Sequence, residues 1–442
     1  MKYDVLVCGG GPSGLNAAIA AARLGAKVLL VEATGLLGGN SVLSLVSPWM
    51  TFHNRGKQIV SGIAQEMVTR LIESHQSMGH IPDPIGFCDT ITPIDSEGAK
   101  ALFFEMIEEA GVDLLLHGTI VSITKVDQSV QEVIVATKGK LHALSATVII
   151  DATGDGDVSV LAGAESIKGR IQDGLAQPMT MIFHVGNVNL DSIRTYLQLH
   201  PEDFTAKDEY TGEYIGVSGF FSKVKEAKAN QEFSLPRDRV LLFQEILPNT
   251  VSINMTRVQG LDATDAFQRS KAETQARKQV KEAFHFLKKY IPGFEDSYIL
   301  RTPSQIGIRE TRHIIGDYIL TIEDVLSRKR FDDSIALSGF PIDIHSPSGS
   351  EVIFHEQDGD FAFGIPLRCL CVKHMKNVIV SGRCISATHE AAASLRVTPS
   401  VMAIGEAAGI LAVLALPHQG DIRQVHYRDV QAKLQSNQQI FE

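Results

Sequence analysis

Residues 2–32, KYDVLVCGGGPSGLNAAIAAARLGAKVLLVE, decide the fold of this chain. The apolar run Lys2–Cys8 predicts a strand, and the alanine-rich run Leu15–Leu24 predicts a helix that can lie close to a sheet. A second apolar run, Lys27–Val31, predicts another strand, which ends at Glu32. This order of strand, helix and strand predicts a βαβ unit with two parallel strands.

The turn between the first strand and the helix carries the G-x-G-x-x-G pattern on Gly9, Gly11 and Gly14. Gly9 permits the tight turn, Gly11 lets the backbone approach a pyrophosphate, and Gly14 allows close contact between helix and strand. The helix N-terminus offers N–H groups and a partial positive charge to the phosphates. Glu32 can accept hydrogen bonds from an adenosine ribose, and its charge disfavours the 2′-phosphate of NADP. The stretch therefore predicts a dinucleotide site.

Composition limits the class of protein. A chain of 442 residues is long enough for two or three domains, and its net charge of −10 argues against nucleic acid or an anionic membrane as the main partner. Its five cysteines are scattered, so we expect no disulfide framework, no metal site and a reducing cytosol. Neither a signal peptide nor a membrane span is expected, and the predicted location is cytoplasmic.

The chain is expected to leave the nucleotide-binding domain and return to it. Residues 1–165 and 366–442 are assigned to that domain, with an irregular excursion at 41–95. Residues 166–365 are assigned to an inserted domain of mixed α+β structure. The wholly apolar run Val148–Asp151 predicts a strand buried in a parallel sheet.

Other elements are predicted from apolar periodicity and from turn residues. The predicted helices are Gly62–Met78, Ser96–Ala110, Asp262–Tyr290 and Ser400–Ala415. The predicted strands are Asp113–Leu116, Gly118–Val126, Glu132–Thr137, Lys140–Ser145, Pro178–Val185, Arg239–Ile246, Thr250–Thr256, Phe340–His345 and Asn377–Arg383.

Four motifs follow one another in flavoprotein order: the βαβ unit, the Gly38-Gly39 loop, the strand end Asp151–Gly154, and the late Gly382 turn followed by an apolar helix. With them, the whole chain resembles the FAD-dependent oxidoreductases of the fumarate-reductase-like and glutathione-reductase-like flavoproteins. The resemblance implies an α/β fold: an FAD-binding Rossmann-like domain with a parallel sheet, plus an inserted mixed α+β substrate domain. The sequences IGIRETR at 306–312 and GRCISATHE at 382–390 also resemble a bacterial flavoprotein family.

The resemblance also implies which residues bind FAD. These are Gly9, Gly11, Pro12, Ser13 and Gly14 at the pyrophosphate, Glu32 and Ala33 at the ribose, Gly38, Gly39, Asn40 and Ser41 at the phosphate and ribityl region, Val121 at the adenine, Ala152, Thr153 and Gly154 at the next turn, Gly382 and Arg383 at the late strand end, and Ser400 and Val401 at the flavin edge. Many relatives have an acidic residue where this chain has Arg383, so their carboxylate contact is missing here. Residues 41–52 contain no His or Cys, and we therefore expect non-covalent FAD.

Catalysis needs polar groups that bind a substrate and manage one proton. The candidates are Arg309, Arg312, His345, His389 and Arg396. Arg309 and Arg312 would share a face if their segment were helical. By resemblance, 389–396 occupies the region where fumarate-reductase-like enzymes carry a His and an Arg that grip a substrate carboxylate, although the compact H-G-x-N-R pattern is absent. Arginine suits the capture of a planar anion.

The sequence therefore predicts an FAD-dependent dehydrogenase or reductase that moves a hydride between flavin N5 and a small polar substrate, possibly one that bears a carboxylate. Its other partner is an unidentified electron donor or acceptor, and a homo-oligomer is possible. One alternative is a flavin-carrying subunit that needs a partner protein, because the chain has no second G-x-G-x-x-G unit. Two further alternatives are a flavin-dependent RNA- or cofactor-modifying enzyme and a simple NAD dehydrogenase.

Overall fold

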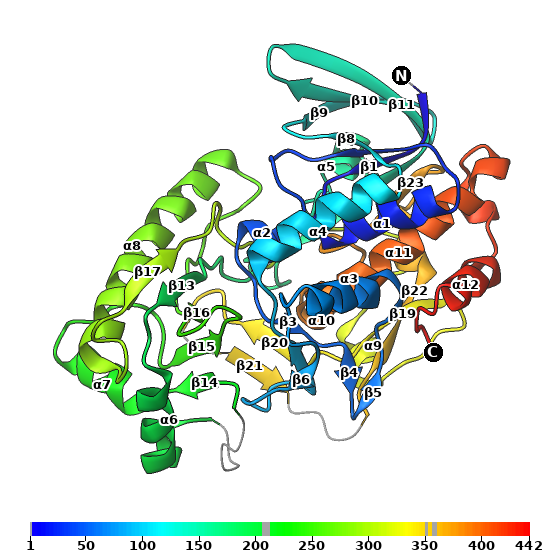
Figure 1. Ribbon diagram of the computed structural model, residues 1–442. Coiled ribbons are helices and arrows are strands. Elements are labelled where there is room, and N and C mark those ends of the chain that lie inside the picture. Colours follow the sequence, from blue (N-terminus) through cyan, green and yellow to red (C-terminus); the bar gives the residue numbers. More distant parts are fainter. Residues whose placement is uncertain (1, 206–212, 350–351, 356–359) are drawn as a thin grey trace.

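The computed structural model describes residues 2–205, 213–349, 352–355 and 360–442. The predicted βαβ unit is present as β1 (Lys2–Cys8), α1 (Pro12–Arg23) and β2 (Val28–Val31), with β1 and β2 parallel. Both strands are buried almost throughout, because helices cover the sheet (Figure 1). The prediction for the first 32 residues is confirmed.

The main sheet has the strand order β8-β2-β1-β11-β10-β9, and β23 pairs with β11. Strands β8 (Asp113–Leu115), β2, β1, β11 (Lys140–Asp151) and β23 (Val378–Val380) run parallel. Strands β10 (Ser129–Thr137) and β9 (Thr119–Val126) add an antiparallel hairpin. The late strand β23 thus returns the chain to the first sheet, as expected for a discontinuous nucleotide-binding domain.

One strand prediction was wrong. The two strands expected at Lys140–Ser145 and Val148–Asp151 are a single strand, β11. Its first half pairs with β10, whereas its second half lies between β1 and β23. The change from alternating to wholly apolar residues therefore marks a change of neighbours and not a break in the strand.

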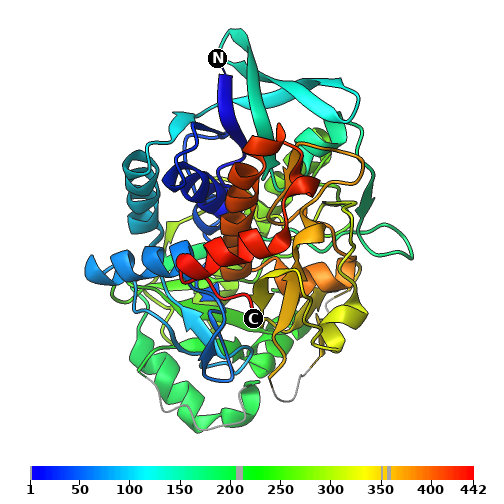
Figure 2. The ribbon, with the colours of Figure 1, turned by 90° about the vertical axis from the view of Figure 1, so that its right-hand side faces the viewer.

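Helix α11 (Thr398–Leu414) packs against α1 and is buried over most of its length. Two of its glycines permit this contact: a Cβ at Gly405 would meet the carbonyl of Ser13, and a Cβ at Gly409 would meet that of Ala17. Helices α3 (Gly62–Glu73), α4 (Ser96–Glu109) and α12 (Tyr427–Ser436) surround the pair, and Figure 2 shows α12 crossing in front of α11.

The inserted lobe is built on an antiparallel sheet of order β14-β15-β16-β13-β17. Its strands are β14 (Gly216–Gly219), β15 (Val240–Gln244), β16 (Val251–Ile253), β13 (Phe183–Gly186) and β17 (Tyr298–Arg301). The long helix α8 (Ala266–Tyr290) packs on it through a row of buried side chains at helical spacing, from Ala272 to Leu287 (Figure 1). This is the mixed structure that the sequence predicts for the region.

The remaining helices and strands are shorter. They are α2 (Asn40–Leu43), β3 (Trp49–Met50), β4 (His53–Asn54), β5 (Lys57–Gln58), β6 (Ile81–Pro82), β7 (Thr90–Thr92), α5 (Asp157–Leu161), β12 (Ser166–Lys168), α6 (Leu190–Leu199), α7 (Phe221–Ala229), β18 (Arg312–Ile314), α9 (Ile322–Leu326), β19 (Ser334–Ser338), β20 (Ile342–His345), β21 (Val352–His355), β22 (Phe363–Pro366) and α10 (His389–Leu395).

Neither a membrane span nor a metal cluster is found in the described ranges. No single helix there combines the length and the hydropathy needed to cross a bilayer, although α10 and α11 together would pass by length and composition, with a bend of 94° between them. No group of three or more His, Cys, Asp or Glu side chains in the same ranges is placed to hold a metal ion.

The contact between α1 and α11 yields a test of the fold. Gly409→Ala should lower the free energy of unfolding by about 1–3 kcal/mol, because the new methyl group would overlap the carbonyl of Ala17. Val413→Ala, on a partly exposed side of the same helix, is the control and should cost less than about 1 kcal/mol. Denaturant unfolding measures both variants, and equal losses would contradict the close contact.

Candidate functional site

The first glycine turn is held by the carboxylate of Glu32. The backbone N–H of Gly10 donates to Glu32 Oε2 at 2.7 Å, and that of Thr34 donates to Oε1 at 2.8 Å. The backbone N–H of Gly38 donates to the carbonyl of Gly10 at 2.8 Å, which joins the second glycine loop to the first. Glu32 is almost wholly buried, so it orders the turn and also lies where a ribose would be bound.

The start of α1 fits a diphosphate. Gly11 is the N-cap, no side chain caps the helix, and Pro12 occupies the first turn. A Cβ added to Gly11 would meet no atom within 4 Å, so the space above the turn is open. Gly9 has φ +104°, which favours glycine, and Gly14 lies against the carbonyl of Gly9. The first-turn N–H groups and the helix dipole are therefore available to an anion.

The start of α11 is a second uncapped helix terminus. Its N-cap, Val397, contributes no side-chain hydrogen bond. The hydroxyl groups of Ser41 and Thr398 lie 3.3 Å apart, which brings the second glycine loop to this helix. The hydroxyl of Ser400 bonds that of Ser338 at 3.0 Å, and Val401 lies one residue further along the helix. This placement suits the predicted role of the helix at the flavin edge.

The side chain of Arg383 forms hydrogen bonds with two other segments of the chain. Its Nε donates to the carbonyl of Gly154 at 2.9 Å, its Nη1 to the carbonyl of Ile308 at 2.5 Å, and its Nη2 to Asp155 Oδ1 at 2.6 Å. The side chain of Asn40 also donates to the carbonyl of Ile308, at 2.9 Å. A carboxylate is thus present beside Arg383, and it comes from Asp155. Sequence reasoning missed Asp155, although the residue directly follows the predicted Gly154.

The other predicted cofactor residues lie at the ends of neighbouring strands. Thr153 and Ala152 follow β11, and the Thr153 hydroxyl donates to Asp151 Oδ1 at 2.8 Å. Gly118, just before β9, donates its N–H to the carbonyl of Glu32 at 3.0 Å. Val121 lies further along β9 and is 43% exposed, so its contact with adenine stays a prediction. The remaining predicted residues flank these turns: Ser13, whose hydroxyl bonds that of Ser381, together with Ala33, Gly39 and Gly382.

Arg309 and Arg312 do not share a helical face. The segment before β18 is extended, because Gly307 pairs with Thr180 and β18 pairs with β12. Arg309 Nη1 donates to the carbonyl of Pro178 at 2.8 Å and to the hydroxyl of Thr180. Arg312 Nη1 instead lies 3.1 Å from Asp157 Oδ1. The two arginines therefore lie in different parts of the structure, and only Arg309 belongs to the cluster described next.

Arg309 and Arg396 lie in a buried cluster with Asp343. Arg396 Nη2 lies 3.7 Å from Asp343 Oδ2 and donates to Gln177 Oε1 at 3.2 Å. Burial and the charge of Arg396 lower the pKa of Arg309. Burial alone would raise the pKa of Asp343, but His345 and the two arginines hold it well below its usual range. Asp343 is therefore ionised, and it faces more than one guanidinium group.

His345 is neutral in this cluster, and its tautomer is defined. Arg257 Nη2 lies 2.9 Å from His345 Nδ1, and arginine can only donate, so Nδ1 accepts. His345 Nε2 then carries the proton and donates to Asp343 Oδ2 at 3.1 Å. Burial lowers the pKa of His345 to about 3, which agrees with a neutral ring. His345 thus bridges Arg257 and Asp343 and is not placed to take up a proton.

Glu310 and His389 form a buried pair beside this cluster. His389 Nδ1 lies 2.8 Å from Glu310 Oε1, and the N–H of Gln177 donates to Oε2 at 2.8 Å. His313 Nε2 approaches Oε1 at 3.4 Å. Burial alone would raise the pKa of Glu310, but hydrogen bonds from His313 and His389 lower it to about 2. An ionised Glu310 can only accept, so His389 carries its proton on Nδ1 and leaves the Nε2 lone pair available. Sequence reasoning missed Glu310, although it lies inside the 306–312 stretch, and it missed Gln177, which stands in no recognised motif.

Two buried donors at this place, Arg396 Nε and Gln177 Nε2, lack a hydrogen-bond partner within the described part of the chain. Buried polar groups are normally paired, so unpaired donors around a cationic cluster indicate a place for a ligand. The acceptor groups that such donors require are those of an anion.

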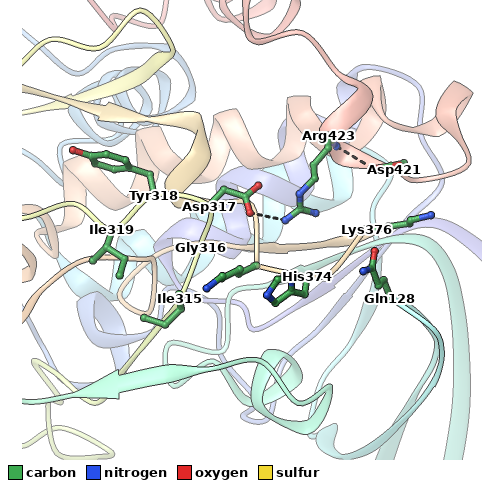
Figure 3. A pocket seen from close by; sticks show the side chains of 11 residues that line it. Gln128, Ile315, Gly316, Asp317, Tyr318, Ile319, His374, Lys376, Asp421 and Arg423 are labelled. Carbon is green, nitrogen blue, oxygen red and sulfur yellow. Dashed lines mark hydrogen bonds and ion pairs between the residues drawn. The ribbon is translucent and has the colours of Figure 1, made fainter.

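A surface pocket elsewhere holds none of the predicted catalytic residues. It encloses about 500 Å³ and is lined by residues that include Tyr318, His374, Lys376 and Arg423 (Figure 3). Arg423 Nη2 is already paired with Asp317 at 2.8 Å. The candidate site is therefore the seam of Arg309, Asp343, His389 and Arg396, where β20, α10 and the inserted lobe meet (Figure 1).

Comparisons with known proteins identify the family and the fold of this chain. A family model described as FAD dependent oxidoreductase matches residues 4–434. No curated protein matches the chain. Many solved structures share the fold. They include a geranylgeranyl bacteriochlorophyll reductase-like protein from Thermoplasma acidophilum, with 12% identity, a TM-score of 0.51, and coverage of 98% of this chain and 83% of that one.

Two further similar structures are flavin enzymes. The p-nitrophenol 4-monooxygenase PnpA from Pseudomonas putida DLL-E4 is 10% identical, with a TM-score of 0.49 and coverage of 98% of this chain and 84% of that one. The flavin-dependent brominase Bmp2 is 12% identical, with a TM-score of 0.46 and coverage of 99% and 84%. The family match over residues 4–434 identifies FAD as the cofactor. The narrower likeness to fumarate-reductase-like or glutathione-reductase-like flavoproteins stays a prediction.

The role of Glu32 can be tested by FAD binding. Glu32→Ala should weaken FAD binding at least about tenfold, because it removes two backbone hydrogen bonds and the ribose acceptor. Reconstitution of the apoprotein, followed by flavin fluorescence, measures the affinity. Glu66→Ala, which removes surface ion pairs with Arg23 and Arg70, should bind FAD like the wild type. Unchanged affinity in the Glu32 variant would refute the assignment.

The ionisation of Glu310 can be tested through stability. Its pKa is depressed from 4.5 to about 2, so its charge stabilises the fold above pH 4.5, and this contribution is lost as pH falls towards 2. Glu310→Gln should therefore cost about 3 kcal/mol at pH 7, and the difference from the wild type should shrink between pH 4.5 and 2. Urea unfolding at several pH values measures it. Exposed Glu73→Gln is the control, and a pH-independent difference would count against the buried carboxylate.

Proposed function

Because this chain belongs to the family of FAD-dependent oxidoreductases, we propose that it is a dehydrogenase or reductase for a small polar substrate with an acidic group. In this proposal a hydride passes between flavin N5 and the substrate. The observation that carries it is the pair Arg309 and Arg396, largely buried at the seam, where the Nε of Arg396 has no hydrogen-bond partner among the residues that the structure describes. FAD supplies the hydride acceptor or donor when it is bound.

Substrate binding is assigned to the two arginines. A guanidinium fork matches the geometry of a carboxylate, and burial strengthens the attraction because water no longer screens it. Asp343 is the nearest carboxylate, but it is shared between Arg396, at 3.7 Å, and His345, at 3.1 Å. The substrate anion would add negative charge beside Arg309 and Arg396, which Asp343 alone does not balance. It would also pair with the donors of Arg396 and Gln177 that have no partner among the described residues.

Proton transfer is assigned to His389. In the oxidising direction the substrate loses a proton along with the hydride, and His389 Nε2 takes that proton. In the reducing direction His389 returns it. Glu310 holds the ring at 2.8 Å and fixes the tautomer in which Nε2 is the acceptor. His345 is unsuited to this role because Nδ1 and Nε2 are both engaged.

A partner-dependent flavoprotein is the second candidate. It is favoured by the absence from the sequence of a second G-x-G-x-x-G unit that would bind a nicotinamide nucleotide. If no purified substrate reduces the flavin of the isolated protein, but a cell lysate does, this alternative is favoured. The cytoplasmic location, the electron partner and a homo-oligomeric state stay predictions.

Anaerobic bleaching of the flavin tests the proposed function. Arg396→Gln and Arg309→Gln should each lower the rate of substrate-driven flavin reduction at least about a hundredfold, because each removes a charge-assisted hydrogen bond from the substrate anion. Arg312→Gln is the matched control, since Arg312 pairs with Asp157 away from the cluster. Rates near the wild type in both cluster variants would overturn the assignment of substrate binding to these arginines.

A further inference from the structure

We propose that the side-chain amide of Gln177 binds a second oxygen atom of the substrate, one that stands on the carbon next to the acid group. The substrate class is then that of 2-hydroxy acids and their 2-oxo counterparts. This inference rests on the proposed function, because it concerns the same substrate, and it names the carbon at which the hydride is exchanged.

The orientation of the Gln177 amide is fixed by its neighbours. Its Oε1 accepts from Arg396 Nη2 at 3.2 Å and from the backbone N–H of His345 at 3.4 Å. Both neighbours can only donate, because neither a guanidinium group nor a backbone N–H carries an acceptor. The amide oxygen, and not the amide nitrogen, must therefore face them, and the NH2 group is turned away from both.

The NH2 group of Gln177 is a buried donor with no acceptor in the described part of the chain. Gln177 is 2% exposed, and its Nε2 lacks a hydrogen-bond partner there. A donor that is buried without an acceptor is unfavourable, and native proteins rarely keep one without a use. The amide thus offers its N–H bonds to an oxygen atom that the described residues do not supply.

Gln177 lies between the group that binds the acid and the group that takes the proton. Its side chain contacts Arg396 directly. Its backbone N–H donates to Glu310 Oε2 at 2.8 Å, while Glu310 Oε1 accepts from His389 Nδ1 at 2.8 Å. One residue is thus hydrogen-bonded to both halves of the proposed site, and a substrate held by Arg396 and His389 would pass its amide.

The acid group of the substrate has donors of its own. Arg396 Nε lacks a partner among the described residues, and Arg309 Nη1 donates at 2.8 Å to the carbonyl of Pro178, the residue that follows Gln177. Two guanidinium groups suffice for the two oxygen atoms of a carboxylate. The Gln177 amide then remains for an oxygen atom outside the carboxylate. Because Gln177 Oε1 already contacts Arg396, Nε2 lies only one amide width further, which suits an oxygen on the adjacent carbon.

This assignment identifies the reacting atoms of the substrate. In the oxidising direction a 2-hydroxy acid loses the hydride of its C2–H bond to flavin N5, its hydroxyl proton passes to His389 Nε2, and a C2=O bond forms. The substrate gives up two electrons, which FAD accepts when it is bound. The oxygen on C2 accepts from Gln177 Nε2 throughout, so the amide stabilises the negative charge that develops on this oxygen as the proton leaves.

Calorimetric titration of the oxidised, FAD-loaded protein tests the inference. The probes are 2-oxo acids from pyruvate to 2-oxohexanoate, which have no hydrogen on C2 to transfer, each compared with the unsubstituted acid of the same carbon number. In the wild type, at least one 2-oxo acid should bind at least about tenfold more tightly than its unsubstituted partner, because it pairs a buried donor that is otherwise unpaired. A smaller ratio for every pair overturns the inference.

Variants of Gln177 locate the preference. Gln177→Glu keeps an oxygen towards Arg396 but replaces the NH2 group by a second oxygen, which repels a carbonyl, and Gln177→Met removes the amide altogether. Both should reduce the ratio to about one or below. Gln131→Glu makes the same change at an exposed position of β10 and should keep the wild-type ratio. The wild-type ratio in either Gln177 variant overturns the inference, and so does loss of FAD from both, because the role of Gln177 would then be structural.

Failure of the proposed function gives a different result. Arg396→Gln should weaken the binding of the unsubstituted acids at least about tenfold, because these acids carry only the carboxylate. If Arg396→Gln binds them as tightly as the wild type does, the proposed function fails. If it weakens them while the wild type does not distinguish 2-oxo acids from unsubstituted acids, only the inference about Gln177 fails.

Discussion

A buried carboxylate, Glu310, joins the segments that form the seam between the two lobes. One oxygen accepts from His389 at the start of α10, and the other accepts from the backbone of Gln177, where the chain enters the inserted lobe. Gln177 in turn accepts from Arg396 through its side chain. Removal of this carboxylate would leave three polar groups from different segments without their acceptor, a costly state in a buried site.

The positions of the arginines follow from this arrangement. Arg396 ends α10, Arg309 lies in the extended segment before Glu310, and Asp343 on β20 faces both. A cluster with excess positive charge is unfavourable in isolation, and proteins retain such clusters where a ligand supplies the missing charge. The α1 and α11 termini have no side-chain caps, and their backbone N–H groups would suit a diphosphate and an electron-rich flavin edge. In the proposed arrangement, backbone dipoles bind the cofactor and side chains bind the substrate anion.

Much of the FAD-binding half could be predicted because the residues that indicate it lie close together along the chain. Gly9, Gly11, Gly14 and Glu32 lie within one short stretch, and periodicity alone placed β1, α1 and β2. The late helix was predictable for the same reason, since Glu406 is the one charged residue in its otherwise apolar run. The join of two predicted strands into β11 was not predictable, because it depends on which strands become neighbours.

The seam was only partly predictable. Arg309, His345, His389 and Arg396 were identified from residue type and position. Arg309 and Arg312 would have shared a face only in a helix, and pairing with distant strands keeps their segment extended. Gln177 and Arg257 were missed because they are far away in sequence from the residues that they contact at the seam. Such contacts between remote segments carry no local signal.

The most direct measurement is a crystal structure of the FAD-loaded protein grown with a saturating small carboxylate. The account predicts a bound anion within hydrogen-bond distance of both Arg309 and Arg396, next to the isoalloxazine ring and within reach of His389. An isoalloxazine ring far from the seam, or an anion bound elsewhere while these arginines contact only water, would contradict it.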